Sequence, residues 1–154
     1  MPGTAQTALS PAEAAAWQGL LRAHASLVRE LDRELRAAHG LPLSWYDVLR
    51  EAGTAPDGRI RMGELADRVM LTPPGLSGLV DRLERAHLIE RRPCDGDGRG
   101  TYAVVTPTGM RRLEHAGATH RDAIRRCYTS RLDDTELVLI GRMWQRIAAA
   151  GRAG

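Results

Sequence analysis

Apolar residues recur at helical spacing in the first quarter of the chain. The steps of three and four residues from Pro11 onward correspond to one face of an α-helix, and the pattern stops at Gly40. Ser10 and Glu13 flank Pro11 as a capping hydroxyl and a first-turn acid do at a helix start. We therefore predict one long amphipathic helix over 11–39. Its apolar stripe comprises Trp17, Leu20, Leu21, His24, Leu27, Val28, Leu31 and Leu35.

The middle of the chain has the pattern of a winged helix-turn-helix. Ser44 is placed to cap a second helix, WYDVLREAG, and a third helix begins at Met62. A short turn separates that helix from the next one, over 73–86, which begins at Thr72-Pro73. LIERRP and TYAVVT then predict two strands on either side of the glycine-rich turn 94–100.

The last third of the chain is predicted to be helical again. Thr106-Pro107 begins a long helical stretch and Asp133 begins a final one, so helices fill most of 107–150. The fold class is therefore mainly α with a small β-hairpin (α+β). We expect a single domain over 1–154, in which a winged helix-turn-helix lobe over 44–106 is flanked by the helices of 11–39 and 107–150. The stripe on 11–39 is longer than one small domain covers, which implies a partner helix.

Composition adds only a weak preference for an anionic partner. The formal charge is +3 with a pI near 9.4, and all 22 basic residues are arginine. Two cysteines are too few for a disulfide framework and lack zinc-site spacing. The N-terminal residues do not resemble a signal peptide, and no apolar run approaches the roughly 20 residues that span a bilayer. We expect a cytoplasmic protein without a membrane partner.

The turn CDGDGRG at 94–100 could in principle bind a metal, bind a phosphate, or form a wing. An EF-hand loop starting at Asp95 would place Arg99 and Thr106 at ligand positions, so calcium is excluded. A dinucleotide loop needs a third glycine where Thr101 stands and a helix where a strand follows. We expect neither a metal nor a cofactor. A plain hairpin turn remains open, but a preceding helix-turn-helix favours a wing whose arginine enters a DNA minor groove.

Two motifs resemble the MarR family of winged-helix transcriptional regulators over about 11–150. The first is Asp97-Gly98-Arg99 followed, after five residues, by Val105-Thr106, and the second is LVDRLERAHLIERRP. The resemblance implies a homodimer in which helices 11–39 and 107–150 of both chains intertwine. It also implies a ligand-responsive repressor that binds a pseudo-palindromic double-stranded DNA operator, with helix 73–86 in the major groove and wing 94–100 in the minor groove.

The resemblance also implies which residues contact DNA. Arg99 enters the minor groove and Asp97 holds it in place. Few side chains on the exposed face of helix 73–86 can form a bidentate bond to a base edge, so specificity should depend on backbone contacts, the wing and DNA shape as well. The DNA-contacting residues expected from the recognition helix are Thr72, Pro73, Pro74, Gly75, Ser77, Gly78 and Arg82.

Family members often bind a small aromatic or phenolic effector between the dimerisation helices and the DNA-binding lobe. The urate-responsive branch uses a Trp, an Asp and two arginines, which Trp17, Asp47 and Arg91 match in part, with Leu79 at the other arginine position. The effector-binding candidates are Trp17, Leu21 and His24 on the first helix, Trp45, Tyr46 and Asp47 on the second, and Arg91.

Other functions have weaker support in the sequence. Cys94 lies in the wing, where its oxidation could disturb DNA binding, although an incidental surface thiol is the simpler interpretation. His115 and His120 are five residues apart and so do not form a helical metal pair. A winged helix can also serve protein contact alone. An enzyme is not expected, because the chain has no nucleophile elbow, zinc motif or phosphate loop.

Overall fold

The computed structural model describes residues 8–94, 96 and 100–150. It contains six α-helices and three strands, joined in two places by short 3₁₀ turns. In chain order these are α1 (Pro11–His39), α2 (Leu43–Gly53), a 3₁₀ turn (Pro56–Gly58), β1 (Arg59–Arg61), α3 (Met62–Arg68), α4 (Pro73–Arg85), β2 (Ile89–Pro93), β3 (Thr101–Val105), α5 (Pro107–Cys127), a second 3₁₀ turn (Thr129–Arg131) and α6 (Asp134–Ala150).

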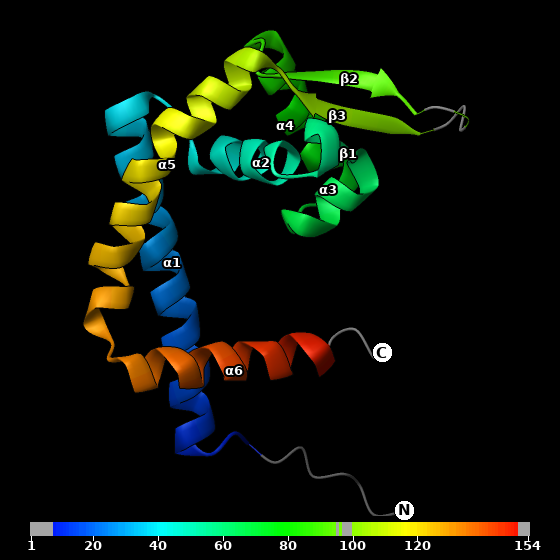
Figure 1. Cartoon of the computed structure of the whole chain (residues 1–154). Helices are drawn as coiled ribbons and strands as arrows, with labels where there is room; N and C mark the ends of the chain where they lie inside the picture. Colours follow the sequence, from blue (N-terminus) through cyan, green and yellow to red (C-terminus); the bar gives the residue numbers. More distant parts are fainter. Residues whose placement is uncertain (1–7, 95, 97–99, 151–154) are drawn as a thin grey trace, which may run out of the picture.

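The chain forms a stalk of helices with a lobe at one end (Figure 1). Helices α1 and α5 pack side by side, and the lobe of α2, α3, α4 and the sheet lies at the end where α1 finishes and α5 begins. Helix α6 lies at the opposite end of the stalk and contributes no buried residue. The predicted mainly helical fold with a winged helix-turn-helix is confirmed.

Side-chain caps mark four of the predicted helix starts, including that of α6, where the carboxylates of Asp133 and Glu136 each accept a hydrogen bond from the other residue's backbone N–H. Ser10 and Glu13 form a reciprocal capping box at the start of α1. The hydroxyl of Thr72 accepts a hydrogen bond from the Gly75 N–H, and that of Thr106 accepts one from the Gly109 N–H. These caps satisfy N–H groups that the helix itself cannot pair.

The predicted Ser44 cap is wrong. Helix α2 begins at Leu43, two residues before the predicted start at Trp45, and the Leu43 N–H donates to Oδ1 of Asp32 over 2.9 Å. Arg36 donates to the other carboxylate oxygen at 2.6 Å. Burial raises the pKa of Asp32, but these hydrogen bonds outweigh it and the pKa is lowered overall. The Asp32 side chain of α1 therefore fixes the start of α2, the first helix of the lobe.

The sheet has three antiparallel strands in the order β1-β3-β2. The predicted hairpin is present, and β1 joins it along the other edge of β3, where Ile60 pairs with Ala103. One face of the sheet buries Ile60, Ile89, Ala103 and Val105 against the helices of the lobe. The core continues through fully buried leucines of α2, α3 and α4, each of which stabilises the fold by about 1.5–3 kcal/mol.

A close backbone crossing joins the lobe to α5. The Thr106 hydroxyl donates to the His87 carbonyl at 2.7 Å, and the Thr106 N–H donates to the Leu88 carbonyl at 3.1 Å. A Cβ on Gly109 would overlap that Leu88 carbonyl oxygen and lie 2.8 Å from Cγ1 of Val105. Because backbone cannot yield as a side chain can, only glycine permits the first turn of α5 to lie here.

We predict that Gly109→Ala lowers the free energy of unfolding by about 1–3 kcal/mol, the usual cost of overpacking a core. Gly78→Ala is the matched control, since a Cβ at this helical position meets nothing within 4 Å and alanine favours the helix by about 1 kcal/mol. Urea denaturation at one protein concentration measures both. Equal stability of the two variants would contradict a tight crossing at Gly109.

Candidate nucleic-acid interface

Helix α4 presents one side to the core and the other to solvent. Leu76, Leu79, Val80 and Leu83 form its buried stripe. Of the residues predicted to contact DNA, Gly78 is half-buried and the others on this helix are exposed: Thr72, Pro73, Pro74, Gly75, Ser77 and Arg82. The structure therefore places the predicted recognition residues together on one accessible surface.

The first residues of α4 provide few backbone hydrogen-bond donors for a phosphate. Pro73 and Pro74 have no N–H, and the Gly75 N–H already donates to Thr72. The positive end of the helix dipole remains, but the usual backbone donors of a helix N-terminus are absent at these positions. A phosphate at this end of α4 would therefore depend on side chains more than on the backbone N–H groups of residues 73–75.

Arg91 ties the wing to this helix. From β2 its guanidinium pairs with the carboxylates of Asp81, at 2.7 Å, and Glu84. Nη2 of Arg91 also donates to the Ser77 carbonyl at 3.0 Å and to the Ser77 hydroxyl at 3.2 Å. The backbone N–H of Arg91 donates to the Glu84 carboxylate at 2.8 Å. Positions 77, 81 and 84 lie on one stripe of α4. One side chain thus fixes the wing against two turns of the recognition helix.

This arrangement leaves Ser77 able to bind DNA as a donor. Its oxygen accepts the hydrogen bond from Arg91, while the hydroxyl proton can still be donated to a phosphate or to an acceptor on a base edge. Sequence reasoning assigned Arg91 to an effector site. The alternating pattern of IERRP could have indicated that Arg91 is directed toward α4. It could not have indicated that its partners there are Ser77, Asp81 and Glu84.

Strand β2 ends at Pro93 and strand β3 begins at Thr101, at the end of the strand pair that lies away from α5 (Figure 1). The Cys94 N–H donates to the Gly100 carbonyl at 2.9 Å and closes the strand pair. Asp97 and Arg99, which are predicted to contact the minor groove, lie outside the described residues.

Cys94 is not the surface thiol that the sequence suggested. The residue is only 5% exposed, at a position just past the end of β2. Redox-sensing thiols are accessible to oxidants. The burial of Cys94 therefore weighs against a sensing role in this conformation.

The effector candidates fall into three places within one chain. Trp17, Leu21 and His24 are exposed on the first half of α1, whereas Arg91 is bound to α4. The candidates on α2 face α5: the ring of Tyr46 lies 4.3 Å from that of His120, centroid to centroid, and is buried. Trp45 and Asp47 beside it are half-buried.

The junction of α2 and α5 perturbs its titratable groups. Burial raises the pKa of Asp47, although Arg50 at 3.7 Å lowers it. Burial lowers the pKa of His120, and the positive charges of Arg50 and Arg121 act in the same direction. Sequence reasoning considered His120 only as a partner for His115, and the structure instead places it in the core between stalk and lobe.

Within the described part of the chain, the ligand atoms of Glu30, Glu34 and Cys127 lie within 4.8 Å of one another. Both carboxylates already pair with guanidinium groups, Glu30 with Arg33 and Glu34 with Arg126. The pair between Glu34 and Arg126 joins α1 to α5. These residues act as an ion-pair network of the stalk.

Comparisons with known proteins agree with this geometry. The family model described as the MarR family matches residues 39–100. The structure of AbsC, a MarR family transcriptional regulator from Streptomyces coelicolor, superposes with a TM-score of 0.90 at 28% identity, covering 97% of this chain and 100% of that one. Sco3205 from the same organism, a MarR family transcriptional regulator in complex with DNA, is 33% identical with a TM-score of 0.86, covering 94% of this chain and 93% of that one.

The chain belongs to the MarR family of transcriptional regulators. It is also 28% identical over 99 residues to the HTH-type transcriptional regulator FarR of Neisseria gonorrhoeae, a match that spans 64% of this chain and 66% of that protein. MarR proteins are DNA-binding regulators of transcription and not enzymes. The winged helix-turn-helix of this chain matches the fold of these regulators. No helix within the described ranges is both long and apolar enough to cross a membrane.

We predict that Arg91→Met lowers the free energy of unfolding by about 1–2 kcal/mol, because it leaves several hydrogen-bonding groups of α4 unpaired. It should also speed hydrogen exchange of the wing amides. Arg92→Met is the control, since Arg92 is 64% exposed and its pair with Glu90 is a surface ion pair worth less than about 1 kcal/mol. Identical exchange in both variants would contradict the role assigned to Arg91.

Proposed function

We propose that this MarR protein is a homodimeric repressor that binds a pseudo-palindromic operator and releases it when a small aromatic or phenolic effector binds. The recognition helix α4 of each chain enters a major groove, and the turn 94–100 enters the adjacent minor groove. The observation that carries the proposal is the exposed face of α4, held in fixed relation to the wing by Arg91. Such a regulator acts in the cytoplasm, where its DNA is.

Contacts to DNA are assigned residue by residue. Ser77 and Arg82 are the polar side chains on the exposed face of α4 that can reach base edges or phosphates. Thr72, Pro73, Pro74, Gly75 and Gly78 shape a surface close to the DNA backbone. Arg99 enters the minor groove and Asp97 positions it. The DNA complex of the Streptomyces regulator Sco3205 supports this mode of binding.

Dimerisation is supported by apolar side chains that one chain leaves uncovered. On α1 these include Trp17, which is 53% exposed, and on α6 Ile147, which is 62% exposed. Burial of each such residue contributes about 1.5–3 kcal/mol. We assign α1, α5 and α6 to the dimerisation region and 44–106 to the DNA-binding lobe. The uncovered large apolar residues of these helices are Trp17, Leu21, Val28, Val138, Leu139, Met143, Trp144 and Ile147.

The effector site is assigned to the junction between stalk and lobe. Tyr46 and Asp47 lie where α2 packs on α5, so a ligand there alters the angle between the DNA-binding lobe and the dimerisation helices. Trp45 is the aromatic candidate beside them on α2, whereas the candidates Trp17, Leu21 and His24 lie apart on the first half of α1. Arg91 links any movement to α4. A redox mechanism through Cys94 is the alternative, which the burial of that thiol disfavours.

The first test measures DNA binding by electrophoretic shift with the segment upstream of the protein's own gene. Arg99→Ala is expected to weaken binding by about 1–3 kcal/mol, which is roughly 5- to 150-fold, while the dimer stays intact. Arg125→Ala, at an exposed arginine of α5, is the control. Unchanged affinity of Arg99→Ala refutes the role of the wing. An absence of wild-type binding at low salt refutes the regulator and favours a protein-interaction module.

A second test concerns the dimer. The double variant Met143→Arg/Ile147→Arg in α6 is expected to weaken self-association by more than about 100-fold, because two apolar side chains no longer pack in the interface. Gln145→Arg, on the opposite side of the same helix, is the control. Sedimentation equilibrium gives the association constants. A monomeric wild-type protein, or a double variant that associates as tightly as the control, would refute the assigned interface.

A further inference from the structure

The wing sheet has a second face that takes no part in the packing of the lobe. Because strand residues alternate, Ile60, Ile89 and Ala103 face the core while their neighbours face outward. Tyr102 pairs in register with Arg61 on one side and Arg92 on the other, and Val104 pairs with Arg59 and Glu90. We call this surface the outer face: Arg59, Arg61, Glu90, Arg92, Tyr102 and Val104.

Arginines gather around one aromatic ring on the outer face. The guanidinium carbon of Arg59 lies 5.1 Å from the centroid of the Tyr102 ring, and that of Arg61 lies 5.8 Å from it. A neutral ring holds these guanidinium groups in place by cation–π attraction without cancelling their charge. Asp57 lies 3.9 Å from Arg59, and Glu90 lies 2.9 Å from Arg92. Among the described residues of this surface, three guanidinium groups thus accompany two carboxylates.

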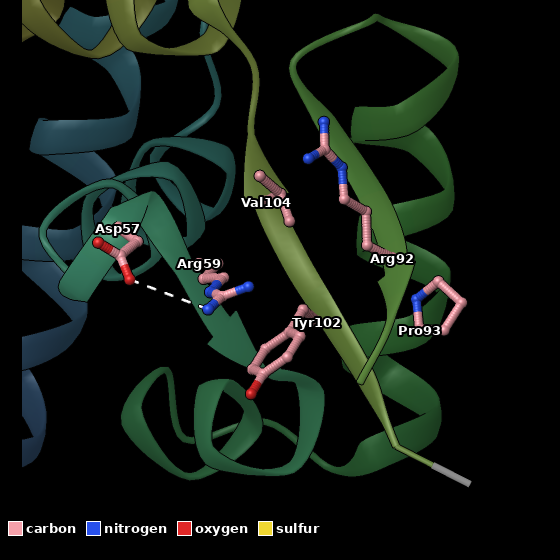
Figure 2. A pocket seen from close by; sticks show the side chains of 6 residues that line it. All are labelled: Asp57, Arg59, Arg92, Pro93, Tyr102 and Val104. Atoms are coloured by element: carbon pink, nitrogen blue, oxygen red, sulfur yellow. Dashed lines mark ion pairs between the residues drawn. The ribbon is translucent and has the colours of Figure 1, made fainter. Parts of the chain in front are cut away.

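The outer face also borders a shallow depression. Its volume is about 390 Å³, and Asp57, Arg59, Arg92, Pro93, Tyr102 and Val104 line it. Figure 2 shows Tyr102 and Val104 on β3 between Arg59 on β1 and Arg92 on β2, with Asp57 on the turn that precedes β1. Small-molecule sites enclose most of their ligand. An open basic surface suits an extended polyanion better than it suits a small molecule.

The position of the outer face identifies the polyanion. Tyr102 and Arg92 lie next to the ends of the wing strands, so this surface is continuous with the turn 94–100 that we assign to the minor groove. Neighbouring strands are about 4.8 Å apart, and Arg59 and Arg92 pair with positions two residues apart on β3, so their backbones are separated by roughly 12 Å. Phosphates of one DNA strand follow one another at about 3.4 Å along the helix axis. The two arginines can therefore contact different phosphates.

We propose that the outer face of the wing sheet binds the phosphate backbone of DNA that flanks the operator beyond the wing. This inference rests on the proposed function. Arg59 and Arg92 contact phosphates as forked donors, and Arg61 and Tyr102 keep Arg59 in place. Flanking contacts of this kind add affinity that is independent of base sequence and sensitive to salt.

The test compares two duplexes by fluorescence anisotropy across a range of salt concentrations. One duplex has the length of the operator footprint, and the other extends it by roughly one helical turn, about 10 base pairs, on each side. Wild-type protein is expected to bind the extended duplex about tenfold more tightly. The double variant Arg59→Gln/Arg92→Gln is expected to bind both duplexes equally, with a salt slope shallower by about 0.9 for each phosphate that the protein no longer neutralises.

Arg125→Gln is the matched control, because Arg125 forms an exposed 2.9 Å ion pair with Asp122, as Arg92 does with Glu90. Thermal unfolding verifies that the variants are folded. If the double variant is not folded, the single variant Arg92→Gln takes its place. The inference is overturned if extension adds no affinity for wild-type protein, or if the variant retains the gain. A wild-type protein that binds neither duplex refutes the proposed function itself, and with it this inference.

Discussion

The architecture depends on apolar surface that one chain does not bury. The long α1 carries large apolar residues on a side that neither α5 nor the lobe covers, and α6 has no buried residue at all. Leaving this surface in water is unfavourable by an amount comparable to the net stability of a domain. We therefore propose that the single chain is half of a structure. In the proposed dimer, a second chain that covers these helices also fixes the separation of the two lobes.

Within the chain, a few polar contacts determine how the lobe is held. Asp32 on α1 fixes the start of α2, and the Thr106 and Gly109 crossing fixes the start of α5 against the turn after α4. Arg91 then fixes the wing to α4. In the proposed mechanism, a change at the junction of α2 and α5 reaches α4 through these short, directional contacts. This is the physical basis for effector control in our proposal.

Much of the fold could be predicted from the sequence because local signals sufficed. Ser10, Thr72 and Thr106 mark helix starts by chemistry that acts within three residues, and all three predictions are confirmed. The Ser44 cap was wrong because a residue eleven positions away from Leu43, Asp32, supplies the acceptor instead. The partners of Arg91 on α4, and the contact of Tyr46 with His120, depend on tertiary packing, which the periodicity of the sequence does not specify. The minor-groove residues Asp97 and Arg99 rest on the motif alone.

If two chains form the dimer that the exposed helices require, two copies of α4 contact DNA at a fixed separation. Hydroxyl-radical footprinting of the operator measures that separation directly. We expect two equivalent protected segments whose centres are about 10–10.5 base pairs, or a whole number of helical turns, apart, and which disappear together on dilution. A single protected half-site occupied by one chain would contradict a dimer of this kind.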